Sequence, residues 1–428
     1  MNRRLRSRAA PARFALLLAA GASAMIATPG HAQSLEAVIA ATLEQSPELA
    51  AARAREAGAN ARLDAARAER MPSATVQGQV ATGRIDPQGF FGLAADNVTP
   101  RSIQFGTELP LFTGGRIGAA EAEARAGIDA ARAGAEAMAL ELRVQVVRAY
   151  AGAIAAHQQA TTQARMIATL EAALRDTRLR FRAGDGTSTE VAQAEARLAE
   201  ARAGLSAAEG AETEARAMLR ALSGMEVTPD AGLPVPAQPA MTPQAAVALA
   251  IAHNPRVRAA ERLLAAARAG LDGARAARMP VVGAYAEAGS VRDQFFPGYK
   301  ADTASVGIRA RWTLFDGGRT GARVRGAQAE MAEREARLRA ERAEIERRTI
   351  AAHAALVSAR ATYDAASTRA EAAAAALRGT RLEVQTGAKP MLALLDAERE
   401  AGAAEGAKTT AAADMQVQAQ LLAALTGS

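Results

Sequence analysis

One stretch occurs twice in this sequence, as Leu111-Phe112-Thr113-Gly114-Gly115-Arg116 and, 203 residues later, as Leu314-Phe315-Asp316-Gly317-Gly318-Arg319. Two adjacent glycines after an apolar pair are typical of a tight turn at which a strand ends. The long uninterrupted run after each arginine indicates that a helix begins there. Two copies of this turn predict a chain built from two related halves.

Further matches extend the duplication in both directions. Upstream the offset is 208 residues, and downstream it stays at 203. The matched pairs are Ser46-Pro47 with Asn254-Pro255, Met71-Pro72 with Met279-Pro280, Gly184 with Gly387, and Leu222-Ser223-Gly224 with Leu425-Thr426-Gly427. We therefore predict one repeat over residues 33–224 and a second over 242–428. The proline-rich segment 225–241, which neither a helix nor a central strand tolerates, is the predicted linker.

Each repeat begins with a predicted helix and continues with two strands. The opening helices start at Ser34 and Thr242 and end before Met71-Pro72 and Met279-Pro280, because a residue that precedes proline leaves the helical region. Apolar and polar residues then alternate, which predicts strands at about 73–84, 102–112, 281–291 and 304–315.

The alternation fits two kinds of sheet, one half-buried in a water-soluble domain and one that faces lipid on one side and water on the other. Strands of about ten residues have the length of transmembrane β-strands. Trp312, near a predicted strand end, suits an aromatic girdle. The strands by themselves leave both interpretations open.

A long helical hairpin follows each glycine turn. The first long helix runs from Arg116 to about Phe181, roughly 100 Å at about 1.5 Å per residue. The chain reverses at Gly184-Asp185-Gly186 and returns as a helix with small and apolar residues at spacings of three and four. Gly387-Ala388-Lys389-Pro390 forms the second reversal. The hairpins 116–223 and 319–426 are thus predicted antiparallel coiled coils.

Residues 1–32 have the pattern of a cleaved secretory signal peptide. Five arginines precede an apolar run from Phe14 to Thr28, which is shorter than the roughly 20 residues of a transmembrane helix, and Ala32 is the expected cleavage position. Without these arginines, the 52 basic residues fall to 47 against 45 acidic ones, and the net charge falls from +7 to +2. With only 3% aromatic residues, this balance argues against a nucleic-acid partner.

The composition also argues against an enzyme. The chain has no cysteine, and His157, His253 and His353 are far apart in sequence. It contains no P-loop for nucleotide phosphates, no GxSxG nucleophile turn and no GxGxxG dinucleotide loop. We expect no catalytic residues, no metal site and no cofactor.

Together, the signal peptide, the duplication, the two Leu-Phe-x-Gly-Gly-Arg turns, the tip glycines and the Leu-x-Gly triplets resemble the TolC family. The resemblance implies a mainly α fold with a small β part, a duplicated helix-strand-strand-long helix-helix unit. It also implies a trimer, in which four strands per chain form a 12-stranded outer-membrane β-barrel and the helices form an α-barrel tunnel. Closure of twelve strands removes the open edges that lipid does not tolerate.

The implied function is an outer-membrane channel that serves as the passive exit duct of a tripartite efflux pump or a type I secretion system. The implied partners are two further copies of the chain, a periplasmic adaptor (membrane fusion) protein, an inner-membrane transporter of RND or ABC type, and outer-membrane lipid. The helical part would lie in the periplasm. A soluble periplasmic coiled-coil scaffold is the alternative, although it would not require duplicated alternating strands.

The resemblance also implies two groups of functional residues. Adaptor contact falls on the hairpin tips, at Gly184, Asp185, Gly186, Gly387, Ala388 and Pro390. A pore gate falls on Glu190, Lys389 and Asp396, whereas the second acidic ring position of the family is Ala393 here.

Each of these positions also has a purely structural interpretation. Gly184 and Gly387 would end helices with a positive φ. Glu190 would complete a capping box with Thr187. Asp396 would interact favourably with a helix dipole near the start of the last helix.

Overall fold

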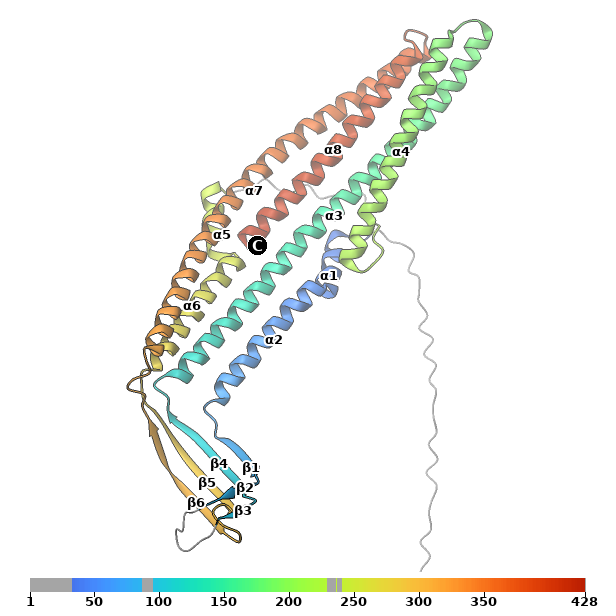
Figure 1. Cartoon of the computed structure of the whole chain (residues 1–428). Helices are drawn as coiled ribbons and strands as arrows, with labels where there is room; N and C mark the ends of the chain where they lie inside the picture. The colour runs from blue at the N-terminus through green and yellow to red at the C-terminus, as the bar shows by residue number, and fades with distance from the viewer. Residues whose placement is uncertain (1–32, 87–94, 229–235, 237–240, 428) are drawn as a thin grey trace, which may run out of the picture.

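The computed structural model describes residues 33–86, 95–228, 236 and 241–427. The molecule is long and narrow, with a small sheet at one end and two helical hairpin tips at the other (Figure 1). The predicted signal peptide 1–32 and most of the predicted linker 225–241 lie outside the described residues.

The two halves repeat one order of elements. The first half contains α1 (Leu35–Gln45), α2 (Pro47–Ala68), β1 (Ser73–Val80), β4 (Arg101–Phe112), α3 (Arg116–Ala183) and α4 (Ser188–Ser223), with a short hairpin of β2 (Gly83–Ile85) and β3 (Asp96–Val98) inserted between β1 and β4. The second half contains α5 (Pro243–His253), α6 (Pro255–Ala276), β5 (Val281–Arg292), β6 (Lys300–Arg311), α7 (Arg319–Gln385) and α8 (Met391–Thr426). The predicted fold class, mainly α with a duplicated unit and a small β part, is confirmed.

The prediction of a single opening helix in each half is wrong. Ser46 and Asn254 have extended backbone conformations, and their side chains cap the helix that follows. Ser46 Oγ accepts a hydrogen bond from the Leu49 amide at 3.3 Å, and Asn254 Oδ1 accepts one from Arg256 at 2.9 Å. The prolines that follow occupy the first helical position, where no backbone N–H is needed. Each Ser-Pro or Asn-Pro pair therefore divides two helices.

Two of the predicted strands differ from those in the structure. The first predicted strand, 73–84, is divided between β1 and β2, and the last one, 304–315, lies at 300–311. Trp312 therefore follows β6, where its indole N–H donates to the carbonyl of Arg278 at 3.0 Å. The alternation of apolar and polar residues continues past Arg311, so the pattern alone did not show the end of the strand.

The four long strands form one antiparallel sheet in the order β1-β4-β5-β6. The register places Phe105 opposite both Val76 and Ala288, so apolar residues of neighbouring strands share a face. That face is exposed, for example at Ile103, Phe105, Val306 and Ile308. The opposite face is polar and carries Gln77, Gln104, Glu287 and Arg309, whose guanidinium lies 4.4 Å from the Tyr285 ring. The sheet is thus apolar on one side and hydrophilic on the other.

Helix α3 lies at the centre of the helical part and packs against α2, α4, α6 and α8. Its buried residues Val146, Val147 and Tyr150 contact a cluster with Val38 and Leu219. On another side, Glu141 of α3 pairs with Arg256 of α6 at 3.0 Å. The core therefore follows the lines of contact between helices and does not form a globular interior. None of the described helices is long and apolar enough to cross a membrane.

Candidate functional site

The first hairpin tip is closed by local hydrogen bonds. Gly184 ends α3 with a φ of +83°, and the amides of Gly184 and Asp185 donate to the carbonyls of Phe181 and Arg180 at 3.1 and 2.9 Å. Glu190 then completes a capping box: its carboxylate accepts from the Thr187 amide at 2.9 Å, and the Thr187 hydroxyl accepts from the Glu190 amide at 3.2 Å. The turn is therefore held by local hydrogen bonds and is exposed.

The second tip has the same backbone turn but no capping box. Gly387 has a φ of +75°, and the amides of Ala388 and Lys389 both donate to the carbonyl of Glu383, at 2.7 and 3.2 Å. Pro390 precedes α8 and supplies no side-chain cap. The Lys389 ammonium lies 2.7 Å from the Glu383 carboxylate of the same hairpin. This tip is held by backbone hydrogen bonds, by the Thr386 hydroxyl, which donates to the Glu383 carbonyl at 3.0 Å, and by one surface ion pair.

The three candidate gate residues do not contact one another within the chain. Glu190 belongs to the capping box and Lys389 pairs with Glu383. Asp396 accepts a hydrogen bond from Arg197 of the other hairpin at 2.8 Å. The sequence reasoning missed Arg197, because it is 199 residues from Asp396 and only the packing of α8 beside the first hairpin brings the two together.

The repeat does reveal further residues near the tips. Arg178 pairs with Glu195 at 2.6 Å, and the equivalent residues Arg381 and Glu398 pair at 2.7 Å. Leu179 and its counterpart Leu382 are both strongly exposed, at 58% and 63%. The offset of 203 residues relates all three pairs of positions. Comparison of the two halves was the signal that would have found them.

The duplicated helices α3 and α7 differ in what covers them. Val147 and Ile154 of α3 are 0% and 9% exposed, whereas their counterparts Ile350 and Val357 on α7 are both 47% exposed. Helix α3 packs against helices of both halves, whereas the packing of α7 among the described helices is against α5, α6 and α8 of its own half. One face of α7 thus lacks the cover that the same face of α3 has.

A family model described as outer membrane efflux protein matches residues 38–225 and 246–428. The chain belongs to this family. A curated relative from Brucella suis, the outer membrane efflux protein BepC, is 27% identical over 66% of the chain and 62% of its own length. Protein CyaE of Bordetella pertussis is 30% identical over 77% of the chain and 70% of its own length. The match with BepC thus spans less than two thirds of that relative.

Solved structures of outer-membrane channels share the fold of this chain. The outer-membrane channel OprN is 25% identical in sequence and superposes with a TM-score of 0.77. The match covers 92% of this chain and 89% of the OprN chain. The open state of the MtrE outer-membrane channel of Neisseria gonorrhoeae is 24% identical, with a TM-score of 0.74 over 92% of this chain and 89% of its own.

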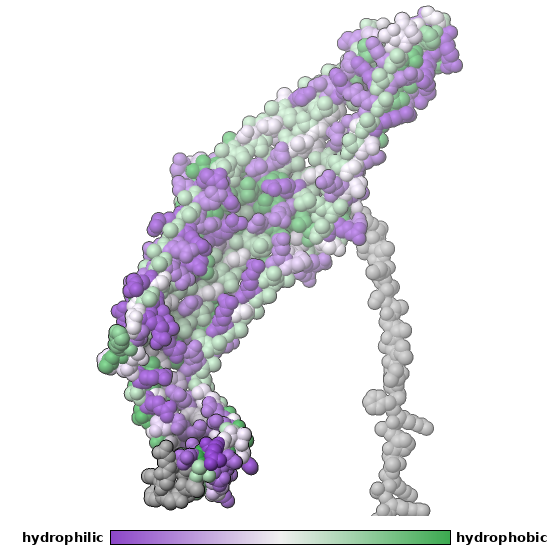
Figure 2. All heavy atoms as spheres, viewed as in Figure 1, coloured by the Kyte–Doolittle hydropathy of each residue, from purple (hydrophilic) through white to green (hydrophobic). Residues whose placement is uncertain are grey.

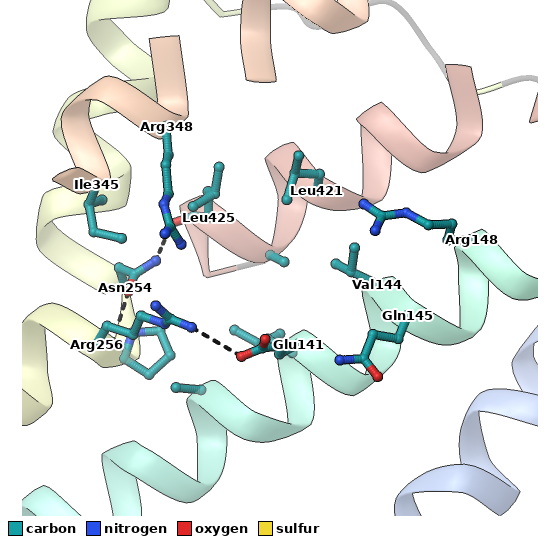
Figure 3. A pocket seen from close by; sticks show the side chains of 14 residues that line it. Glu141, Val144, Gln145, Arg148, Asn254, Arg256, Ile345, Arg348, Leu421 and Leu425 are labelled. Carbon is teal, nitrogen blue, oxygen red and sulfur yellow. Dashed lines mark hydrogen bonds and ion pairs between the residues drawn. The ribbon is translucent and has the colours of Figure 1, made fainter. Parts of the chain in front are cut away.

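The two halves of this efflux family member meet at a cavity of about 260 Å³ (Figure 3). Val144 of α3 and Leu421 of α8 line it, and the Asn254 amide donates to the carbonyl of Leu425 at 2.9 Å. Asn254 therefore ties the break between α5 and α6 to the end of α8. Figure 2 shows hydrophilic residues interspersed with hydrophobic ones along the helical body, as expected of helices that water wets on part of their surface.

Carboxylates on the long helices have shifted pKa values. Hydrogen bonds from Arg347 and Arg348 lower the pKa of Glu344 to about 2. Partial burial, and then the charge of Glu330, raise the pKa of Glu123. Over the described part of the chain, no group of three or more His, Asp or Glu residues is arranged to hold a metal ion.

Proposed function

We propose that this chain forms a homotrimeric outer-membrane channel, the passive exit duct of a tripartite efflux pump or a type I secretion system. Three sheets would close into one 12-stranded barrel, and the helices would form a tunnel through the periplasm. The observation that carries the proposal is the sheet with one exposed apolar face and one polar face. A single sheet of this kind leaves the outer edges of β1 and β6 unpaired, and lipid tolerates strands only when such edges are closed.

The uncovered face of α7 supports assembly with further copies. Within the chain, α3 of the first half packs against α8 of the second half. The repeat relates α3 to α7 and α8 to α4, so the equivalent contact would join α7 to α4. These two helices do not pack against each other within the described part of one chain. Met218 of α4 is 54% exposed, whereas its counterpart Leu421 on α8 is partly covered. Contact between α7 and α4 of a neighbouring copy would bury Ile350, Val357 and Met218 together.

The hairpin tips are the proposed contact for a periplasmic adaptor protein, which links the duct to an inner-membrane transporter of RND or ABC type. Gly184, Asp185 and Gly186 at one tip, with Gly387, Ala388 and Pro390 at the other, lie at the far end of the molecule from the sheet. The exposed leucines 179 and 382 beside them offer apolar contact. Glu190, Lys389 and Asp396 lie near these tips as the proposed gate.

Single-channel conductance of the purified, folded trimer in a planar bilayer tests this function. We expect small, cation-selective steps from the wild type, larger steps or lower selectivity from Asp396→Ala and Glu190→Ala, and wild-type steps from the matched control Glu209→Ala. A folded trimer that gives no steps in any variant would contradict the channel. Recovery of the protein in periplasmic extract, and not in the outer-membrane fraction, would favour the soluble scaffold.

A further inference from the structure

Three basic residues form a row across the end of the sheet farthest from the helices. Arg101 of β4 lies directly opposite Arg292 of β5, and Arg292 lies directly opposite Lys300 of β6. Residues that face each other across neighbouring strands project from the same side of the sheet. We call these three residues the outer row.

The outer row belongs to the apolar face of the sheet. Because side chains alternate along a strand, Arg101 projects on the same side as Ile103 and Phe105, and Lys300 on the same side as Val306. The other end of this face, near the helices, carries Val282 opposite Ala310 and no charged residue. Charged residues on this face are therefore confined to its outer end, where three cations stand beside one carboxylate, Asp302.

The positive charge of the outer row is only partly compensated. Arg292 donates to the Asp302 carboxylate at 2.9 Å. Arg101 and Lys300 form no ion pair with any of the residues the structure describes, and the sequence of the segment 87–94 contains no acidic residue. The nearby carboxylate of Asp293 accepts from the Gly298 amide at 2.7 Å and shapes the turn between β5 and β6. Asp302 lies on the same face, and its carboxylate pairs with Arg292, so Arg101 and Lys300 are the two cations left without an ion pair among the described residues.

An aromatic cluster lies beyond the outer row, in the turn between β5 and β6. Tyr299 packs edge-to-face against Phe295 and Phe296, with ring centroids 4.9 and 5.4 Å apart. Phe295 remains 54% exposed. Aromatic residues in transmembrane barrels concentrate at the boundary between acyl chains and headgroups. The position of the cluster therefore places the outer row at headgroup level.

We propose that the outer row binds the phosphate groups of a phosphorylated glycolipid of the outer leaflet, a lipid of the diphosphoryl lipid A type. This inference rests on the proposed insertion of the sheet into the outer membrane. The guanidinium of Arg101 can bind a phosphate through two parallel N–H groups, and Lys300 adds a point charge beside it. The acyl chains would lie along Ile103, Phe105 and Val306 on the same face.

Affinity for diphosphoryl lipid A tests the site. The detergent-solubilised trimer is titrated with this lipid, with its dephosphorylated form and with inorganic phosphate, and binding is followed by thermophoresis. Loss of two surface cations in Arg101→Gln/Lys300→Gln is expected to weaken binding about twenty-five-fold, at about fivefold per cation. The control Arg278→Gln/Arg311→Gln removes the same charge near the helices and is expected to bind as the wild type does.

Two results would overturn the site: equal affinity of the outer-row variant and the wild type, or equal binding of the dephosphorylated lipid. Affinity for inorganic phosphate equal to that for the lipid would also contradict a lipid ligand. Conductance measurements distinguish a failure of the lipid site from a failure of the proposed channel function. The outer-row variant is expected to give wild-type steps in phosphatidylcholine bilayers, and absence of steps from the wild type would instead contradict the proposed function.

Discussion

The two halves of the chain have the same order of elements but are held by different contacts. At the turn before the long helix, Asp316 in the second half accepts from the Gly318 and Thr320 amides at 3.0 and 2.7 Å, whereas the first half has Thr113 at this position. At the tips, a capping box stands in the first half and none in the second. The duplication therefore conserves backbone geometry more strictly than side-chain contacts.

The largest expected difference between the halves lies at the glycine turns. A Cβ at Gly114 would overlap the side chain of Met279, whereas one at Gly317 would meet open space within the chain. Both glycines have positive φ, of 63° and 68°. We expect Gly317→Ala to cost about 1 kcal/mol for the backbone alone and Gly114→Ala about 3 kcal/mol. Thermal unfolding of the two variants in detergent measures these losses of stability. Equal losses in Gly114→Ala and Gly317→Ala would contradict the expected difference between the halves.

The capping box gives the next largest difference. Thr187→Ala removes one of its two hydrogen bonds and should destabilise the start of α4 by about 1 kcal/mol. Amide hydrogen exchange over the first turn of α4 should rise to the level of the uncapped first turn of α8. Ser188→Ala is the matched control, and no rise above this control would show that the box does not hold the tip.

The ion pair between Asp396 and Arg197 is expected to contribute less to stability and more to conductance. The two side chains are 49% and 32% exposed, and pairs of this kind are worth at most about 1 kcal/mol. Asp396→Ala and Arg197→Ala should each increase channel conductance to the same extent, because each removes the same link between the hairpins. The double variant should add nothing further, and additive effects would argue against a shared role.

The smallest expected effect is a pH dependence confined to the second half. Hydrogen bonds from Thr320 lower the pKa of Asp316 in the folded protein. The ionised carboxylate therefore stabilises the fold fully above the ordinary pKa of about 4, and this stabilisation is lost as the pH falls through the lower pKa of the folded state. The difference in Tm between wild type and Asp316→Asn should shrink below about pH 4. Thr113→Asp should introduce only a weaker dependence in the first half, because Ile117 stands at the position of Thr320 and has no hydroxyl. A constant Tm difference between wild type and Asp316→Asn at every pH would contradict the assignment.

The sequence predicted the features that depend on local residues. Glycine pairs and helical periodicity identified the turns and hairpins, and the alternation of residues identified a two-faced sheet. The breaks at Ser46 and Asn254 were also encoded locally, but the prolines were interpreted as landmarks within one helix and not as first helical residues. Strand ends were missed where the alternation continued past Arg311.

Other features depend on how the two halves pack, and no local pattern encodes them. The contact of Arg197 with Asp396 requires α8 to lie beside the first hairpin. The repeat predicts similar surroundings for α3 and α7, yet α3 lies between the halves and α7 lies at one side of the molecule (Figure 1). The exposure of Ile350 and Val357 follows from this position and not from their sequence.

Cross-linking between copies tests the central claim, closure of several chains around one duct, most directly. The chain has no cysteine, so Ile350→Cys/Met218→Cys introduces one reactive pair per chain. Helices α4 and α7 do not pack against each other in the described part of one chain, so a short bismaleimide linker is expected to join the two residues only between copies. We predict covalent dimers and trimers from outer membranes of the double variant, and at most dimers from either single variant. A double variant that gives only monomers would contradict the account.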